Sequence, residues 1–520
     1  MDSSVLLYEL NNESAGVIAA LGDHYRCDSE PGTPWQILYL DSFDWRLFRH
    51  GFILKWERSG TLSLRTELSL NAMDGSAQRK LQVRKNPLFA RELPSSALRS
   101  KLERIIGDRR LLVMSALNLI GVAARILDDE EKTVARIFTA HGTASAPEGP
   151  SHCPIPPLVE LRAVKGYGGV FRELKARLEA LPEAQPHRGS LFEFALEAVG
   201  RTAGDYSPAV VVQLDSAMPV EAAAAVILQS QLAIVEANLE GVQQDWDPEF
   251  LHDLRVAARR TRSLLRQFKE VLPRSGFKRL RKDLRWIGRS TGPKRDIDVY
   301  LSTMATYDRI FSSEIVKGLQ PLREYLTNRQ REEQALVAAE LKSARFRRLL
   351  SDWKEAIESS GRAASDIPIA KIAAARIIGA HRNILDSGGR IGDRFDPVQM
   401  HRLRIACKEL RYLLEFFQTL YGPKVLSRLI KEMKRLQDVL GQINDLQVQQ
   451  ENLQRYAKAM VSEDISKTNT LLNMGRLLGH FETSQVKLFP EFQASFRSFS
   501  RKSLHDALTD ELFHYLEDSL

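Results

Sequence analysis

The chain repeats itself at an offset of 149 residues, with no insertion or deletion between the two copies. Apolar and polar residues both recur. The identical pairs in the first part of the repeat are His252 and His401, Leu254 and Leu403, Arg255 and Arg404, Ala257 and Ala406, Arg262 and Arg411, Leu264 and Leu413, Leu265 and Leu414, and Phe268 and Phe417. A hydrophobic core accounts for the copied apolar residues, but not for a copied histidine and copied cations. The repeat therefore predicts two related helical halves whose polar surface has a function of its own.

The copied cations fall on one face of each predicted helix. His252, Arg255, Arg259, Arg262 and Arg266 are spaced by three or four residues, as side chains on one stripe of an α-helix are. The second copy has His401, Arg404, Lys408 and Arg411, and the next helices add Lys278, Lys282, Arg285 and Arg289, and then Lys424, Arg428, Lys431 and Lys434. Like charges one turn apart cost roughly a few tenths of a kcal/mol per pair. A ligand with regularly spaced negative charges would offset that cost in a basic groove or pore.

The net charge of +8 over 520 residues is unevenly distributed. Residues 252–301 carry a net charge of +10 and residues 401–448 carry +4, so the rest of the chain is acidic. A solvated surface is the ordinary explanation of one basic helix. Duplication of the same face, histidine included, instead favours a polyanionic ligand.

The sequence changes character near residue 215. Before it, segments rich in β-forming residues alternate with turns, which predicts strands at 35–40, 51–56, 62–70, 112–127, 132–140 and 157–164 and a loop at 143–157. After it, the apolar residues follow the helical period, with a break expected at Gly441 between helices 424–440 and 443–460. We therefore predict an α+β chain of two domains: an N-terminal domain at 1–190, a linker at 191–215, and an all-α bundle at 216–516 with halves of about 216–350 and 368–516.

The cysteines indicate a reducing compartment. Cys27, Cys153 and Cys407 are far apart and form neither a disulfide nor a metal-binding pattern. The N-terminus has no basic and apolar regions typical of a signal peptide. The longest apolar run, 111–127, contains two polar residues and is short for a membrane span. We expect a cytoplasmic protein without a membrane span and without a resident metal or cofactor.

The repeated segments resemble a known family. "HDLRVAARRTRSLLRQF" with "GPKRDIDVYL", and "HRLRIACKELRYLLEFF" with "GQINDLQV", are similar to the two halves of the CHAD domain, the conserved-histidine α-helical domain, over about 216–516. The resemblance implies a helical bundle with a pseudo-twofold axis and a basic central pore that binds inorganic polyphosphate, with polyphosphate granules as a further candidate partner. The implied contacts are His252, Arg255, Arg259, Arg262, Lys282, Arg285, His401, Arg404, Lys408, Arg411, Lys431 and Lys434.

The second copy departs from the family pattern at two places. Arg295 of the first copy is replaced by Asn444, and Arg289 is replaced by Asp438. Asp296 and Asp445 are present in both copies, where we expect them to cap a helix or to hold a basic side chain. The resemblance therefore predicts that the second copy holds the polymer more weakly than the first.

The N-terminal part resembles the CYTH, or triphosphate-tunnel, family. "LYLDSFDWRLFRHGFILKW", "KTVARIF" and "LVELRAVKG" are similar to strands of that antiparallel β tunnel. Active members open with E-x-E-x-K, whereas here Glu9 is followed by Asn11 and by Glu13 at the lysine position. The candidate catalytic residues are Glu9 and Glu160, and Mg²⁺ or Mn²⁺ would be required only if this tunnel were active. The substitutions predict a tunnel domain without catalytic activity.

Three functions compete at this stage. The leading hypothesis is a polyphosphate-binding protein, and the first alternative is a metal-dependent inorganic triphosphatase or polyphosphatase of the CYTH type. The second alternative is nucleic-acid binding, which basic helices alone would permit. Single-strand binders usually place aromatic residues among the cations, and the basic stripes contain none. Nucleic acid is therefore the less favoured polyanion.

Overall fold

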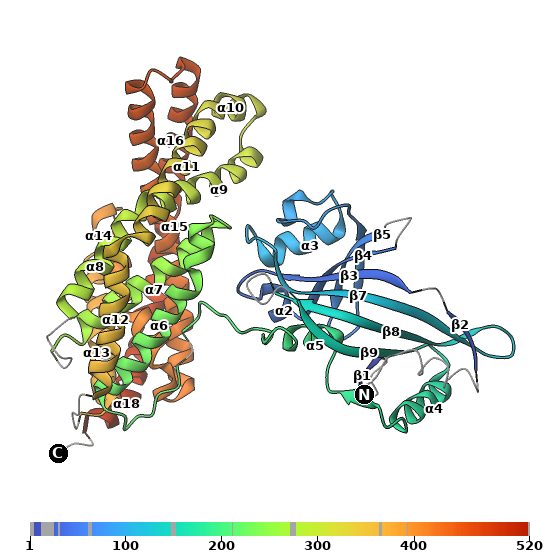
Figure 1. Ribbon diagram of the computed structural model, residues 1–520. Helices are drawn as coiled ribbons and strands as arrows, with labels where there is room; N and C mark the ends of the chain where they lie inside the picture. The colour runs from blue at the N-terminus through green and yellow to red at the C-terminus, as the bar shows by residue number, and fades with distance from the viewer. Residues whose placement is uncertain are drawn as a thin grey trace. The chain divides into compact units, whose positions relative to one another are not determined.

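The computed structural model describes residues 5–11, 25–29, 32–60, 65–146, 152–210, 212–270, 277–362, 367–392 and 394–517. The chain forms two compact units, Met1–Ser207 and Pro208–Leu520 (Figure 1). The boundary falls inside the stretch 191–215 that was expected to be a linker. The first part of that stretch forms a helix that packs in the core of the first unit, as described below.

The first unit is built on one antiparallel sheet of ten strands. Their order is β10-β1-β9-β8-β7-β3-β4-β5-β6, with β2 paired to β7. The strands are β1 (Val5–Leu10), β2 (Arg26–Ser29), β3 (Thr33–Asp41), β4 (Phe52–Ser59), β5 (Arg65–Ala72), β6 (Gln78–Gln82), β7 (Leu112–Leu127), β8 (Thr133–Ser145), β9 (Cys153–Ala163) and β10 (Ala184–His187).

Side chains alternate between the two faces of this sheet, as the period of a β-strand requires. On β1, Leu7 joins a core that includes Phe192 and Phe194 of α5 (Leu191–Glu197), whereas Tyr8 joins the core beneath α4 (Gly168–Glu179). A third core lies where α3 (Ala97–Ile106) packs beside β4 and β5. The short helix α2 (Arg46–Arg49) and the 3₁₀ turn η1 (Ala90–Glu92) complete the unit.

The six predicted strands are confirmed, but four others were not predicted. β1, β2, β6 and β10 have only four to six residues each, which is too short for a clear alternation of apolar and polar residues. The predicted loop at 143–157 was wrong at both ends, because β8 continues to Ser145 and β9 begins at Cys153. Pro156 and Pro157 fall where the register between β8 and β9 shifts, between Ala140 and Gly142.

The second unit is helical from Val220 onward in the part that the structure describes. The helices are α6 (Val220–Gln243), α7 (Pro248–Gln267), α8 (Phe277–Ser290), α9 (Gly292–Ile310), α10 (Ser313–Gly318), α11 (Gln320–Lys342), α12 (Ala344–Arg362), α13 (Ile369–Gly389), α14 (Pro397–Phe417), α15 (Pro423–Ser462), α16 (Thr468–Lys487), α17 (Phe489–Phe499) and α18 (Lys502–Glu517), with the 3₁₀ turn η2 (Gln418–Leu420) after α14.

Contacts between helices group them into two matching sets. α6 packs on α7 and α12, and α8 packs on α7 and α12; likewise α13 packs on α14 and α18, and α15 packs on α14 and α18. α9, α10, α11 and α16 project with one end of α15 as a separate arm (Figure 1). The arm has its own core, which contains Tyr300, Leu326, Tyr456 and Phe481.

The predicted helix break at Gly441 is wrong. In the first copy, α8 ends at Ser290 and α9 starts at Gly292. In the second copy, the matching residues lie inside α15, which runs unbroken for 40 residues. The first copy has Pro293 where the second has Gln442. Because proline lacks the backbone N–H and clashes with the preceding turn, only the first copy has to begin a new helix there.

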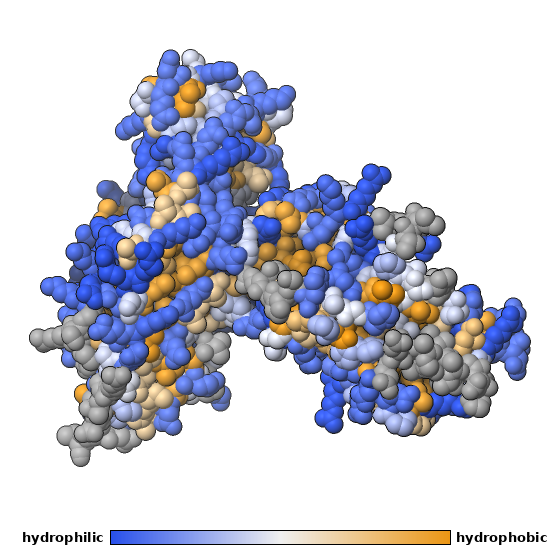
Figure 2. Space-filling model, viewed as in Figure 1, coloured by the Kyte–Doolittle hydropathy of each residue, from blue (hydrophilic) through white to orange (hydrophobic). Residues whose placement is uncertain are grey.

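One described helix, α6, is long and apolar enough to cross a membrane by length and composition, with a mean hydropathy of 1.4. Most of that helix is buried inside the helical unit, against α7 and α12. A core helix has the same properties. Hydrophilic side chains predominate on the face of the helical unit seen in Figure 2.

Candidate functional site

The two helices that carry the copied histidines begin in the same way. α7 starts after Asp247, whose carboxylate accepts a hydrogen bond from the N–H of Glu249 at 2.8 Å. α14 starts after Asp396, whose carboxylate accepts one from the N–H of Val398 at 2.9 Å. A proline occupies the first turn of both helices. Since each histidine lies five residues after its capping aspartate, the two basic stripes start at the same place on their helices.

α7 and α14 contact each other through two reciprocal ion pairs. Arg260 binds Glu415 at 2.8 Å, and Arg266 binds Glu409 at 2.5 Å. Position 260 corresponds to 409 in the repeat, and position 266 corresponds to 415. One contact is thus used twice with the roles of the copies exchanged, as at a twofold interface. This packing brings the basic faces of the two copies together.

A groove of about 470 Å³, here called the basic groove, receives side chains from both copies. One acidic residue, Glu409, lies among its cations, and Glu409 is already paired with Arg266. The lining residues are Arg259, Arg262, Ser263, Arg266, Arg281, Arg285, His401, Arg404, Ile405, Lys408, Glu409 and Tyr412. The groove therefore offers a dense array of donors for an anion with several charges.

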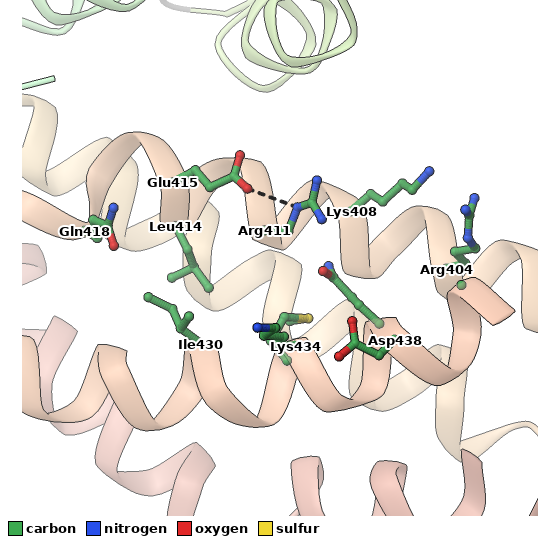
Figure 3. Close-up of a pocket in the computed structure, with 12 residues that line it drawn as sticks. Arg404, Lys408, Arg411, Leu414, Glu415, Gln418, Ile430, Lys434 and Asp438 are labelled. Carbon is green, nitrogen blue, oxygen red and sulfur yellow. Dashed lines mark ion pairs between the residues drawn. The ribbon is translucent and has the colours of Figure 1, made fainter. Parts of the chain in front are cut away.

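A second cavity of about 420 Å³, here called the second-copy pocket, lies between α14 and α15 (Figure 3). It shares Arg404 and Lys408 with the basic groove. Its other lining residues mix cations, carboxylates, amides and apolar groups: Arg411, Leu414, Glu415, Gln418, Ile430, Met433, Lys434, Gln437, Asp438 and Gly441. The two cavities thus meet at Arg404 and Lys408.

The cations at this junction are close enough to disturb one another. Burial, followed by the charges of Arg404, Arg259 and Arg411, lowers the pKa of Lys408 to about 7. Burial and the charge of Arg259 also lower the pKa of Arg255, to about 10. The Nε atoms of Arg259 and Arg404 are buried and have no hydrogen-bond partner among the described residues. Each of these effects disfavours the charged groove while it lacks an anion.

Four of the predicted contact residues line neither cavity. Arg255 is turned inward, where its Nη1 donates to the carbonyl of Gly288 at 2.7 Å and to Oγ1 of Thr291 at 2.6 Å. His252 contacts Arg295 rather than the basic groove. Lys282 and Lys431 are exposed on α8 and α15. The other eight line the basic groove, the second-copy pocket or both.

The two histidines have different partners. Nη2 of Arg295 donates to Nδ1 of His252 at 3.0 Å, and since arginine only donates, this bond requires a neutral His252 with its proton on Nε2. Nδ1 of His401 instead lies 2.9 Å from Oδ1 of Asn444, to which it donates. The change from arginine to asparagine between the copies thus makes Nδ1 an acceptor in His252 and a donor in His401. Of the two histidines, His401 lines the basic groove.

The implied set of contacts omitted two cations of the basic groove, Arg266 and Arg281. Arg266 belongs to the α7 stripe, and Arg281 precedes Lys282 on α8. Periodicity shows which residues share a face, but not which part of that face turns toward α14. Asp445 lies inside α15 and holds Arg404 at 3.5 Å, so the expectation that it holds a basic side chain is confirmed and the capping role is wrong.

The two candidate catalytic carboxylates of the first unit each have a basic partner. Glu9 lies 2.9 Å from Nδ1 of His187. Glu160 is buried and forms an ion pair with Arg162. Glu13 lies outside the described residues. Among the residues that are described, no three acidic, histidine or cysteine side chains are grouped as metal ligands would be.

The aspartate of the "LYLDSFDW" motif has a structural role. The Asp41 carboxylate accepts hydrogen bonds from the N–H groups of Ser42, Leu47 and Phe48 at 2.7 to 2.9 Å. These bonds fix the corner between β3 and α2, where Trp45 adopts a left-handed conformation with a φ of 57°. Burial nevertheless raises the pKa of Asp41 to about 6. This motif therefore shapes the chain instead of contributing a reactive group.

Residues 226–454 match the family model of the CHAD domain. Among solved structures, the crystal structure of the CHAD domain from the plant Ricinus communis is 26% identical, covers 58% of this chain and 94% of its own, and has a TM-score of 0.46. PptA from Streptomyces chartreusis is 15% identical, covers 54% and 100%, and has a TM-score of 0.43. The PH1819 protein from Pyrococcus horikoshii OT3 is 9% identical, covers 37% and 95%, and has a TM-score of 0.24. No curated protein matches the chain.

Proposed function

We propose that the CHAD domain carried by the C-terminal unit binds inorganic polyphosphate, free or in granules, through the basic groove. The observation that carries this proposal is the crowding of cations from both copies around one cavity with a single, already paired acid. Arginine holds phosphate oxygens in pairs through its planar fork. A phosphate polymer presents such oxygens at regular spacing, which matches a row of cations on two neighbouring helices.

The depressed pKa of Lys408 supports an anionic ligand of high charge density. A lysine whose pKa is about 7 is half neutral at physiological pH. An anion placed beside Lys408, Arg404 and Arg259 favours the charged form of all three. Binding of the anion therefore offsets the unfavourable free energy that burial and repulsion between the cations cause in the groove without ligand.

Nucleic acid fits the basic groove less well. Its one aromatic lining residue, Tyr412, was not predicted by the stripe pattern and is only 5% exposed. A base needs an exposed ring for stacking, and Tyr412 does not provide one. A polymer made only of phosphate has no such requirement.

We further propose that the first unit does not hydrolyse the polymer. Its candidate carboxylates are engaged by His187 and Arg162, and apolar residues such as Leu7, Leu158 and Phe192 fill the core beside them. Hydrolysis assisted by Mg²⁺ or Mn²⁺ needs several oxygen ligands around one ion. Phosphate release from tripolyphosphate with either metal, lost on Glu9→Ala, would contradict this part of the proposal.

The test of binding compares two double variants of equal charge in the full-length protein. Arg262→Gln with Lys408→Gln removes two cations from the basic groove, and Lys282→Gln with Lys431→Gln removes two exposed cations from outside both cavities. We expect the first variant to weaken polyphosphate binding at least tenfold and the second to change it only slightly, measured by calorimetric titration. Equal losses would show that net charge alone attracts the polymer, and no binding by the unmodified protein would end the proposal.

A further inference from the structure

Several positions that lose a cation in the second copy surround one cavity. Nine positions are cationic in the first copy and not in the second. Four of these, Arg266, Lys269, Arg281 and Arg289, correspond to Glu415, Gln418, Ile430 and Asp438. All four of the replacing residues line the second-copy pocket. At six other positions both copies keep a cation, among them Arg255 and Arg404, Arg259 and Lys408, Arg262 and Arg411, and Arg285 and Lys434.

The changed residues leave fewer cations available to a ligand in the second-copy pocket. Nε of Arg411 forms an ion pair with Glu415 at 3.1 Å (Figure 3). Leu414 and Ile430 face each other across the pocket in the same view. A phosphate chain entering here would meet four cations, two carboxylates and an apolar wall, whereas the basic groove has seven Arg or Lys residues and one paired carboxylate. Like charge and lost hydration both oppose its entry.

Internal stability does not explain all four of these changes. Glu415 is needed at the contact with α7, where it binds Arg260 at 2.8 Å. Asp438, in contrast, forms no ion pair with any described residue, and Gln418 is exposed. The loss of cations at positions 418 and 438 therefore has no evident structural purpose, whereas the losses at 418, 430 and 438 all reduce the attraction for phosphate at one place.

We infer that the second-copy pocket ends the cationic surface, so that the polymer is held on one side only. The ligand lies across the first copy and the junction at Arg404 and Lys408, and it does not continue along α15. Gln418, Ile430 and Asp438 are thus specificity-determining residues for chain length. This inference rests on the proposed binding of polyphosphate, and it makes a short chain, or the end of a long one, the preferred ligand.

The experiment restores the first-copy residues in the full-length protein. The triple variant Gln418→Lys, Ile430→Arg and Asp438→Arg keeps Glu415, so the contact with Arg260 is retained. The number of phosphates covered per protein is measured by titration with a long polymer, and affinities are compared for tripolyphosphate, a short oligomer and the long polymer. We expect the variant to cover more phosphates per protein and to gain affinity for the long polymer only. The slope of the logarithm of the binding constant against the logarithm of the salt concentration should steepen by roughly 0.7 per added contact.

A matched control adds the same charge elsewhere. The control triple variant changes three exposed residues that line neither cavity: Gln454→Lys, Leu336→Arg and Asp506→Arg. It should cover the same number of phosphates per protein, the site size, as the unmodified protein. The inference is wrong if both triple variants gain equally, or if restoring the cations leaves the site size and salt dependence unchanged. Asp438→Asn keeps the shape of the side chain and is therefore not expected to disturb folding. This single variant should gain a small amount of affinity for the long polymer only. Absence of binding by the unmodified protein would instead contradict the proposed function.

Discussion

Lys408 shows at the scale of single residues how neighbours set the charge of the basic groove. Its pKa is lowered to about 7 by burial and by Arg404, Arg259 and Arg411. The proposed polyphosphate ligand would favour the charged amine, so above pH 7 binding would be coupled to the uptake of a proton. Affinity should fall as the pH rises from 7, by up to one log unit per pH unit from this group.

Lys408→Arg should remove that part of the pH dependence, since arginine stays charged. Lys431→Arg, a change at an exposed lysine outside both cavities, should leave the pH profile intact. Titrations at a series of pH values would check this, and identical profiles for Lys408→Arg and the unmodified protein would contradict it.

Lys408 also makes the stability of the protein without ligand depend on pH. In the folded protein Lys408 loses its proton near pH 7, whereas in the unfolded chain it keeps the proton up to its ordinary pKa of 10.5. Between these pH values the unfolded chain therefore binds one more proton than the folded protein. The Lys408 contribution to stability therefore rises with pH across that window.

At the scale of helices, the ion pair between Arg260 and Glu415 joins the two copies. Their side chains are 9% and 26% exposed, so the loss of one partner leaves a charge in a largely dry contact. Glu415→Gln should lower the free energy of unfolding by about 1–3 kcal/mol, and a double-mutant cycle with Arg260→Gln should show coupling of similar size. The exposed pair of Lys354 and Glu236 is the control, with an expected coupling below about 1 kcal/mol. Equal coupling in the two cycles would contradict a special role for the contact between copies.

The helices also show what the sequence can and cannot predict. The 149-residue register and the apolar period predicted that His252 and His401 lie at matching positions on two helices, as they do on α7 and α14. The glycine at position 441 predicts a break, but α15 continues through it because no proline follows at position 442. Arg255 was expected in the site, but a helix face does not reveal that its guanidinium reaches back to Gly288. The asymmetry of the copies was visible in the sequence, although only the cavities showed where it matters.

At the scale of the whole molecule, the division into two compact units predicts a selective response to ligand. Polyphosphate that binds only the helical unit should raise the unfolding temperature of that unit and leave the β unit unchanged. A ligand at about one hundred times its Kd adds roughly 2.7 kcal/mol to the stability of the state that binds it. Scanning calorimetry with and without polymer would measure this. A rise in unfolding temperature confined to the β unit would contradict the proposal, because the ligand would then bind outside the helical unit.

The reciprocal pairs at the contact of α7 and α14 have a consequence for how this molecule evolved. Two first halves would place arginine opposite arginine at both contacts, and two second halves would place glutamate opposite glutamate. Each half is therefore complementary in charge to the other half and not to a copy of itself. Divergence at two positions has made the contact between the former duplicates asymmetric, so a molecule built from two first halves or two second halves would lose both ion pairs.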